Sequence, residues 1–107
     1  MERVNVAEKL ASFQKTWSPK IIAELNGQYV KVVKTDGEYV WHHHDDEDEL
    51  FYVLKGSIVL QVRDQPDVTL AQGEMAVVPR GVEHCPSSHG VSYILVFEPK
   101  VLVSSGD

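Results

Sequence analysis

The sequence predicts an all-β protein, built as an antiparallel sandwich, jelly roll or barrel with one short N-terminal helix. Three observations support this prediction. From residue 20 onward, short runs rich in β-branched residues alternate with turn signals. Eight such runs are present, and the tight turns between them favour antiparallel neighbours. Helical periodicity is confined to the residues before position 20.

The helix is expected at about 6–15. Asn5 and Glu8 have the spacing of a capping box. An apolar stripe follows at helical intervals: Val6, Leu10, Phe13 and Trp17. Ser18 precedes Pro19, and a residue before proline is pushed out of the helical region, so the helix must end by this point.

The expected strands fill one barrel at about 20–99. They cover residues 20–25, 29–35, 38–44, 49–55, 57–63, 68–71, 74–78 and 92–98. Turns are expected at Asn26-Gly27, Asp36-Gly37, Lys55-Gly56, Gln65-Pro66 and Gln72-Gly73. No repeat or linker interrupts the chain, and 107 residues suit one compact domain, so we expect a single domain over 1–107.

Charge and cysteine content narrow the partners and the compartment. A formal net charge of −6 disfavours nucleic acid and anionic membrane surfaces, which leaves small molecules, cations or proteins. Cys85 is the only cysteine, so an internal disulfide is impossible and a reducing, cytoplasmic location is the default expectation. Charges interrupt every apolar stretch near the N-terminus, which argues against a secretory signal, and no run approaches the length of a membrane span.

Three consecutive histidines occupy positions 42–44, inside the stretch WHHHDDEDE. A purification tag is excluded, since they lie between two predicted strands. Side chains alternate along a strand, so His42 and His44 are expected on one face with Val40, and His43 on the other. Two imidazoles on one face can clamp a metal ion, although a hydrogen-bonded or solvent-exposed pair would give the same pattern.

Two further residues favour the metal. Glu49 opens the next predicted strand, in phase with Phe51 and Val53, and His84 follows a turn downstream. Buried polar groups on an apolar face need a partner, because an unpaired one costs on the order of 1–3 kcal/mol. A metal ion would serve all of them. The acidic neighbours read as a solvated loop that raises local negative potential: Asp45, Asp46, Glu47 and Asp48.

Two stretches together resemble the motifs of the cupins, small barrels described as a double-stranded β-helix or jelly roll. Residues 37–56, GEYVWHHHDDEDELFYVLKG, resemble the first motif, and residues 73–84, GEMAVVPRGVEH, resemble the second. Sixteen residues separate them, as in small bacterial single-domain cupins. The spacing from Gly37 to His42 is one residue shorter than usual, and Ser88 stands where the second motif usually ends in Asn.

The resemblance implies a metal site with ligands His42, His44, Glu49 and His84. Such a donor set suits one divalent transition metal, whether Fe, Mn, Co, Ni or Zn. Four protein ligands fill a tetrahedral zinc site, whereas an octahedral ion would keep two positions open. Among small cupins the chain is most similar to the mannose-6-phosphate-isomerase-like group, a grouping by sequence that does not establish that reaction.

Two functions remain open at this point. One is a metalloenzyme acting on a small polar metabolite by isomerisation or oxygen-dependent cleavage; the other is a non-catalytic ligand-binding or sensor module with a structural metal. A barrel that kept the fold and lost the site is a third possibility. No general acid or base is evident besides the ligands, and no cation is evident inside the barrel, since Lys55 and Arg80 fall at turns.

A homodimer is the expected assembly. The outward face of the predicted strand 49–55 is apolar, and the strand before it adds two aromatic residues. These residues are Leu50, Tyr52, Leu54, Tyr39 and Trp41. An apolar surface of this extent needs a cover, which a two-fold related copy would provide.

Overall fold

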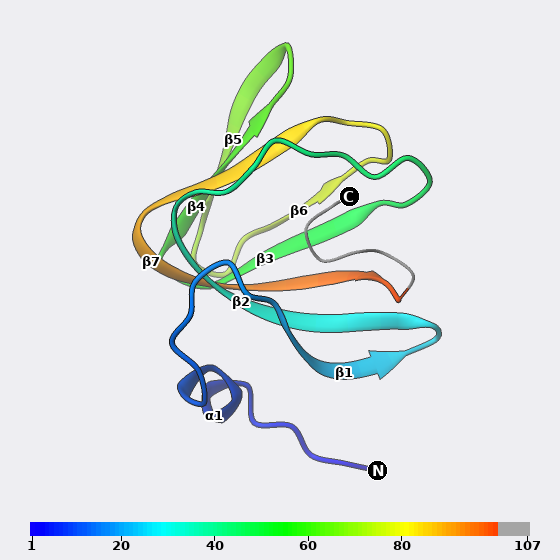
Figure 1. Cartoon of the computed structure of the whole chain (residues 1–107), viewed down its shortest axis with the longest axis vertical. Coiled ribbons are helices and arrows are strands. Elements are labelled where there is room, and N and C mark those ends of the chain that lie inside the picture. Colours follow the sequence, from blue (N-terminus) through cyan, green and yellow to red (C-terminus); the bar gives the residue numbers. More distant parts are fainter. Residues whose placement is uncertain (101–107) are drawn as a thin grey trace.

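The structure, a computed structural model, describes residues 1–100, and it confirms the all-β prediction. One helix and seven strands follow one another along the chain (Figure 1). Their bounds are α1 Val6–Ala11, β1 Lys20–Leu25, β2 Gln28–Glu38, β3 Glu49–Lys55, β4 Ser57–Val62, β5 Gln65–Ala71, β6 Met75–Val78 and β7 His84–Pro99. No helix within this described part is long and apolar enough to cross a membrane.

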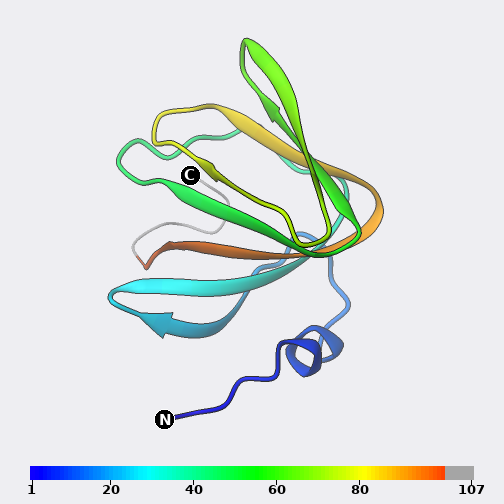
Figure 2. The same ribbon diagram turned by 180° about the vertical axis from the view of Figure 1, so that it is seen from behind.

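Strand β7 organises the barrel, because it pairs with three other strands along its 16 residues. All pairs are antiparallel, and the main path runs β1-β2-β7-β3-β6, with β4 on the first part of β7 and β5 on β4. The curved β7 ribbon is followed from yellow to orange in Figures 1 and 2, which also show the β4–β5 hairpin projecting at the end opposite α1. This curvature closes the sheet around one interior.

The interior has a continuous apolar core. In β3, residues 49, 51 and 53 are buried while 50, 52 and 54 are half-buried, which confirms the predicted alternation and places Glu49 on the core face. The apolar core consists of Val33, Phe51, Val53, Ile58, Leu60, Leu70, Val78, Ile94 and Val96. Burial of a set this size is the main favourable term in folding. Glu49 is therefore a carboxyl group held at the edge of a hydrophobic core.

The helix is shorter than predicted. It starts as expected, with the Asn5 side chain accepting a hydrogen bond from the backbone N–H of Glu8 at 3.0 Å, but it ends at Ala11. Beyond it, the Phe13 carbonyl accepts a hydrogen bond from Lys34 Nζ at 2.6 Å. Trp17, at φ +53°, donates its backbone N–H to the Lys34 carbonyl at 2.8 Å. The prediction of a helix to residue 15 was wrong because these contacts with β2 outweigh local helical propensity.

The pattern of strands and turns differs from the prediction in four places. Residues 39–48 form no strand, and only an isolated bridge joins His42 to His84. The predicted strand 92–98 is the end of a longer strand that starts at His84. The predicted turn at Asp36-Gly37 is instead a register shift within β2, and the turn expected at Gln65-Pro66 falls earlier, where Asp64 adopts φ +59°. The eight expected strands are therefore seven.

Candidate metal centre

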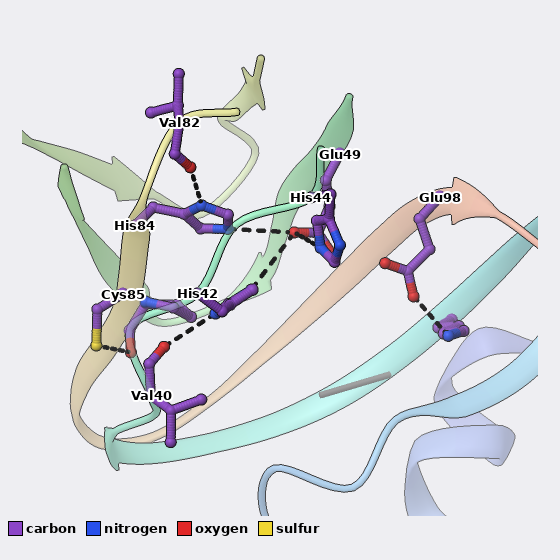
Figure 3. Close-up of polar contacts among 10 residues, drawn as sticks. Val40, His42, His44, Glu49, Val82, His84, Cys85 and Glu98 are labelled. Carbon is purple, nitrogen blue, oxygen red and sulfur yellow. Dashed lines mark hydrogen bonds and ion pairs between the residues drawn. The ribbon is translucent and has the colours of Figure 1, made fainter. Parts of the chain in front are cut away.

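Backbone hydrogen bonds hold the two sequence motifs together at one end of the barrel. The His42 N–H donates to the His84 carbonyl at 3.0 Å, and the His84 N–H donates to the His42 carbonyl at 2.9 Å. A third hydrogen bond joins the same two segments, from the Gly81 N–H to the His44 carbonyl at 2.7 Å. The segments that carry His42 and His84 are thus held side by side, which sets the positions from which their imidazoles project (Figure 3).

Three imidazoles converge on one oxygen, Glu49 Oε1 (Figure 3). The Nε2 atoms of His84, His44 and His42 lie 3.3, 3.5 and 4.0 Å from it. Ligand atoms bound at about 2.0–2.1 Å to one tetrahedral ion are roughly 3.3–3.4 Å apart, so these separations suit a common ion. His42, Glu49 and His84 form one triad of close donor atoms, and His44, Glu49 and Glu98 form a second. The structure therefore brings the four predicted residues together around Glu49.

Hydrogen bonds at the Nδ1 atoms of His42 and His84 indicate which nitrogen of each ring carries a hydrogen. His42 Nδ1 lies 2.9 Å from the Val40 carbonyl, and His84 Nδ1 lies 2.9 Å from the Val82 carbonyl. Carbonyl oxygens only accept, so both Nδ1 atoms carry a hydrogen, and each ring presents its Nε2 atom to Glu49. His84 Nε2 lies within hydrogen-bond distance of Glu49 Oε1, at 3.3 Å, but one carboxylate oxygen facing three ring nitrogens needs a cation or protons between them. This is how imidazoles are oriented for metal binding.

Burial limits how far protons can satisfy this arrangement. His84 is fully buried, and desolvation lowers the pKa of His42, which disfavours its imidazolium form. His44 Nε2 is buried and has no hydrogen-bond partner among residues 1–100, and it lies 3.5 Å from Glu49 Oε1. The neighbouring Glu49 carboxylate nevertheless raises the pKa of His44. Burial opposes ionisation of Glu49, but contacts with His44 and His84 outweigh it and lower its pKa.

The residues around the histidines do not follow strand alternation. Val40, expected beside His42 inside the barrel, is 49% exposed, and Tyr39, expected outside, lines the pocket and stacks on Trp17 at 4.9 Å between ring centroids. Both predictions were wrong because residues 39–44 form no strand. His43 lies outside and pairs with Asp45 at 3.0 Å.

The acidic stretch meets the second motif through one residue. Asp45, Asp46 and Asp48 are exposed, as expected for a solvated loop. Asp48 Oδ1 accepts hydrogen bonds from the Arg80 backbone N–H at 2.9 Å and from Arg80 Nε at 3.4 Å. These bonds lower the pKa of Asp48 and join the loop to the turn before His84.

Two charged residues of the site were missed in the sequence. Lys31 of β2 and Glu98 of β7 are buried, and Lys31 Nζ donates a hydrogen bond to Glu98 Oε1. Both line the same pocket as His42 and Glu49, so the interior does contain a cation, contrary to expectation. Burial, and then the nearby Glu49, raise the pKa of Glu98 to about 7. The signal for Glu98 was its phase with Ile94 and Val96 on a strand whose face is otherwise apolar.

The pocket beside the cluster encloses about 410 Å³ of space, part of it open to solvent. Its charged end carries His42, Glu49, Lys31 and Glu98. Its walls are apolar and mostly flat, and consist of Trp17, Pro19, Val33, Tyr39, Phe51, Pro86, Ile94 and Val96. A concave apolar slot with a few converging polar groups is typical of small-molecule sites.

The fold is a jelly-roll barrel, and three histidines and a glutamate converge at one end of its interior. These two features define the class of the protein, a small β-barrel with a candidate metal centre. The sequence profile of the cupin domain family matches residues 29–97. This chain belongs to the cupin family, as its two motifs predicted.

Relatives of known sequence or structure agree with this assignment. A crystal structure of a cupin-2 domain protein from Shewanella frigidimarina is 45% identical, with a TM-score of 0.87 over 90% of this chain and 93% of that one. The Bacillus subtilis protein YdbB is 35% identical over 89% of this chain and 78% of its own length. The 3-hydroxyanthranilate 3,4-dioxygenase of Mus musculus is 33% identical over 95% of this chain, which spans 36% of that enzyme.

Proposed function

We propose that this chain is a metal-dependent cupin enzyme that uses a divalent ion to oxidise a small phenolic or other aromatic metabolite with dioxygen. One observation carries the metal part of this proposal: the Nε2 atoms of His42, His44 and His84 surround Glu49 Oε1 in a buried site. Similarity to a 3-hydroxyanthranilate 3,4-dioxygenase supports the reaction class.

The four proposed ligands are His42, His44, Glu49 and His84, which fit a divalent ion by donor type and spacing. When bound, a redox-active ion such as iron supplies Lewis acidity and the one-electron chemistry that reactions with dioxygen require. Val40 and Val82 keep the two Nδ1 hydrogens in place through their carbonyls, so both rings stay aimed inward. Apolar side chains form most of the pocket wall beside these ligands.

Glu98 is the candidate proton carrier of this site. Its carboxyl group lies in the pocket beside Glu49, and its pKa of about 7 allows it to hold or release a proton near neutral pH. A phenol would give up its proton more readily beside a bound cation, and Glu98 would be placed to accept that proton. Glu49 is less suited to this role, because its pKa lies well below the usual range.

Oxygen uptake tests the proposed reaction. Protein reconstituted with Fe²⁺ should consume dioxygen when given 3-hydroxyanthranilate or a substituted hydroquinone, and His42→Ala should abolish the uptake. Equal thermal stabilisation by several divalent ions, without turnover of any of these compounds, would instead support a non-catalytic binding module. A grouping with mannose-6-phosphate-isomerase-like cupins stays a prediction, and a sugar phosphate would need more positive charge than the one paired lysine provides.

Two further predictions concern the assembly and the cellular location of the protein. A homodimer is supported by the edge strand β6, where Met75 is 57% and Val77 54% exposed, and where Val77 lies beside Leu50 of β3. Sedimentation of a monomer at micromolar concentration would refute it.

A reducing, cytoplasmic location rests on the single Cys85, which is buried.

A further inference from the structure

Lys31 is placed where a cation is uncommon, inside the barrel beside the metal centre. It pairs with Val96 of β7 in the β2–β7 register, and its side chain is 5% exposed and lines the pocket. A buried lysine requires a partner for its charge. That partner is Glu98, on the face of β7 that also carries Val96.

The ion pair leaves Lys31 with unused hydrogen-bonding capacity. An ammonium group has three donors, and among residues 1–100 its Nζ donates to one acceptor, Glu98 Oε1, while lying 5.8 Å from the Tyr29 ring centroid. Glu98 is itself shared, since a carboxylate oxygen of this residue lies within 4.8 Å of the donor atoms of His44 and Glu49. The lysine can therefore bind a second anionic group without losing its first.

The charge of the loaded pocket points to the charge of the ligand. In the metal-bound state the ligand imidazoles are deprotonated and Glu49 is ionised, and the Glu98 carboxylate is paired with the Lys31 ammonium. These side chains together carry one negative charge. A divalent ion reverses this balance to a single positive charge. Inside a low-dielectric pocket, an uncompensated charge is costly, so a ligand with one negative charge matches the loaded site.

The walls of the pocket point to the shape of the ligand. The rings of Trp17 and Tyr39 lie 26° from parallel and line the pocket with Phe51. Trp17 is held by hydrogen bonds from its Nε1 to the Asp36 carbonyl and from its backbone N–H to the Lys34 carbonyl, both at 2.8 Å. Rigid aromatic faces favour a planar molecule that stacks against them.

We propose that Lys31 makes this pocket selective for a planar, singly anionic small molecule, binding its carboxylate while the opposite end of the molecule faces the cluster of His42, His44, Glu49 and His84. This inference rests on the proposed function, because it names the substrate class of the same site. It makes Lys31 the specificity-determining residue for the charge of the ligand.

Three matched ligands test the proposal by calorimetry on the Mn²⁺-loaded protein under nitrogen. These are 4-hydroxybenzoate, its neutral amide 4-hydroxybenzamide, and the non-planar trans-4-hydroxycyclohexanecarboxylate. We expect 4-hydroxybenzoate to bind at least about tenfold more tightly than either of the others. Equal affinity for 4-hydroxybenzoate and 4-hydroxybenzamide, or no binding of any of the three ligands, would overturn the proposal.

Variants locate the selectivity. Lys31→Met should reduce the preference for benzoate over benzamide to less than about threefold, whereas Lys31→Arg should keep it. Lys55→Met is the matched control, since it removes an exposed lysine outside the pocket and should leave the preference unchanged. Glu98→Gln changes the site in the opposite direction and should tighten benzoate binding, which keeps the test valid if Lys31→Met does not fold. Retained preference in Lys31→Met, or weaker benzoate binding in Glu98→Gln, would contradict the role of Lys31.

Titration with Mn²⁺ alone separates this proposal from the proposed function. Lys31→Met should bind the ion at least as tightly as the wild type, because it removes a positive charge next to the cation. Normal Mn²⁺ binding without selectivity for an anion would overturn the role of Lys31 and leave the metal site standing. Absence of Mn²⁺ binding in the wild type would overturn both.

Discussion

Two buried polar clusters in this barrel satisfy their hydrogen bonds in opposite ways. In the first, Thr35 and Ser88 share a hydrogen bond of 2.8 Å between their hydroxyls, and the Ser92 hydroxyl donates to the Ser57 carbonyl at 2.9 Å. In the second, the three Nε2 atoms of the histidines surround Glu49 Oε1, and one of them has no hydrogen-bond partner among residues 1–100. Both clusters touch β7.

The difference separates structure from function. A closed network of hydroxyls stabilises one arrangement of strands and needs nothing from outside. A buried polar group without a hydrogen-bond partner costs on the order of 1–3 kcal/mol of stability, so a cluster with such a group persists only if a bound ligand or a function compensates for the cost. The histidine cluster is thus the place where this barrel gives up stability for binding. The predictions below change one cluster or a residue next to it and follow metal affinity, stability or both.

The largest effect is expected from Glu49→Gln. Loss of a residue that only orients a metal ligand lowers metal affinity by about 10–100-fold, so loss of Glu49, the proposed carboxylate ligand, should lower it by more than about 100-fold. The glutamine amide can donate to an imidazole Nε2, so the metal-free variant should melt no lower than the wild type. Competitive titration with a chromogenic chelator and thermal melting give the two values. Unchanged metal affinity would remove Glu49 from the site.

The opposite pattern is expected from Gly56→Ala, in the hydroxyl cluster. Gly56 has φ +86°, and an added Cβ would lie 2.5 Å from Ser92 Oγ, whose hydroxyl accepts from the Ser57 N–H. Strain of this kind costs about 1–3 kcal/mol, so the free energy of unfolding should fall by that amount. Metal affinity measured in the folded protein should stay within twofold, with twofold as a rough limit for additive, distant sites. Coupled losses of both would show that the clusters are not independent.

The pH dependence of metal binding sharpens the comparison further. The pKa of His44 is raised above 6.5, so its proton competes with the ion already in the neutral range. Metal affinity should therefore fall as the pH drops through about 7 to 6, by roughly tenfold per pH unit for each proton displaced. In the metal-free protein the sign is opposite: the proton on His44 stabilises the fold below pH 6.5, and this contribution is lost as the pH rises. Titrations at pH 8, 7 and 6 measure the first effect, and pH-independent affinity would place His44 outside the metal site.

The smallest effect is expected from His43→Ala. His43 lies between two proposed ligands in sequence, but its side chain is 45% exposed and pairs with Asp45 outside the barrel. Its removal should change metal affinity by less than about twofold, since exposed ion pairs contribute little. The same titration as for Glu49→Gln provides the comparison. A large loss would mean that the three histidines act together on a surface site.

Sequence patterns predicted those parts of the molecule in which the two faces of a strand differ. Strand β3 was predicted to the residue, because Glu49 shares a face with Phe51 and Val53 while the other face is only half-buried. The four proposed ligands came from two motifs whose spacing is specific. Residues 38–44 were predicted as a strand because their composition resembles one, although β2 ends at Glu38 and only His42 of residues 39–44 makes a bridge.

Contacts across the barrel were beyond the reach of local patterns. Strand β2 carries valine and lysine on both faces, so periodicity cannot tell whether Lys31 or Lys34 points inward. The helix end was missed for a similar reason, because hydrogen bonds with Lys34 determine the path of residues 12–19. Lys31 can be placed in the pocket only when the register of β2 against β7 is known.

Anomalous diffraction tests the central claim most directly. Crystals of protein purified without added metal and then soaked in Mn²⁺ or Co²⁺ should show one anomalous peak within about 2.0–2.3 Å of Nε2 of His42, His44 and His84 and of a carboxylate oxygen of Glu49. Replacement of Glu49 by glutamine should remove the peak. An ion bound elsewhere, or no peak at these four side chains in the wild type, would contradict the proposal that two motifs of this chain hold a single metal.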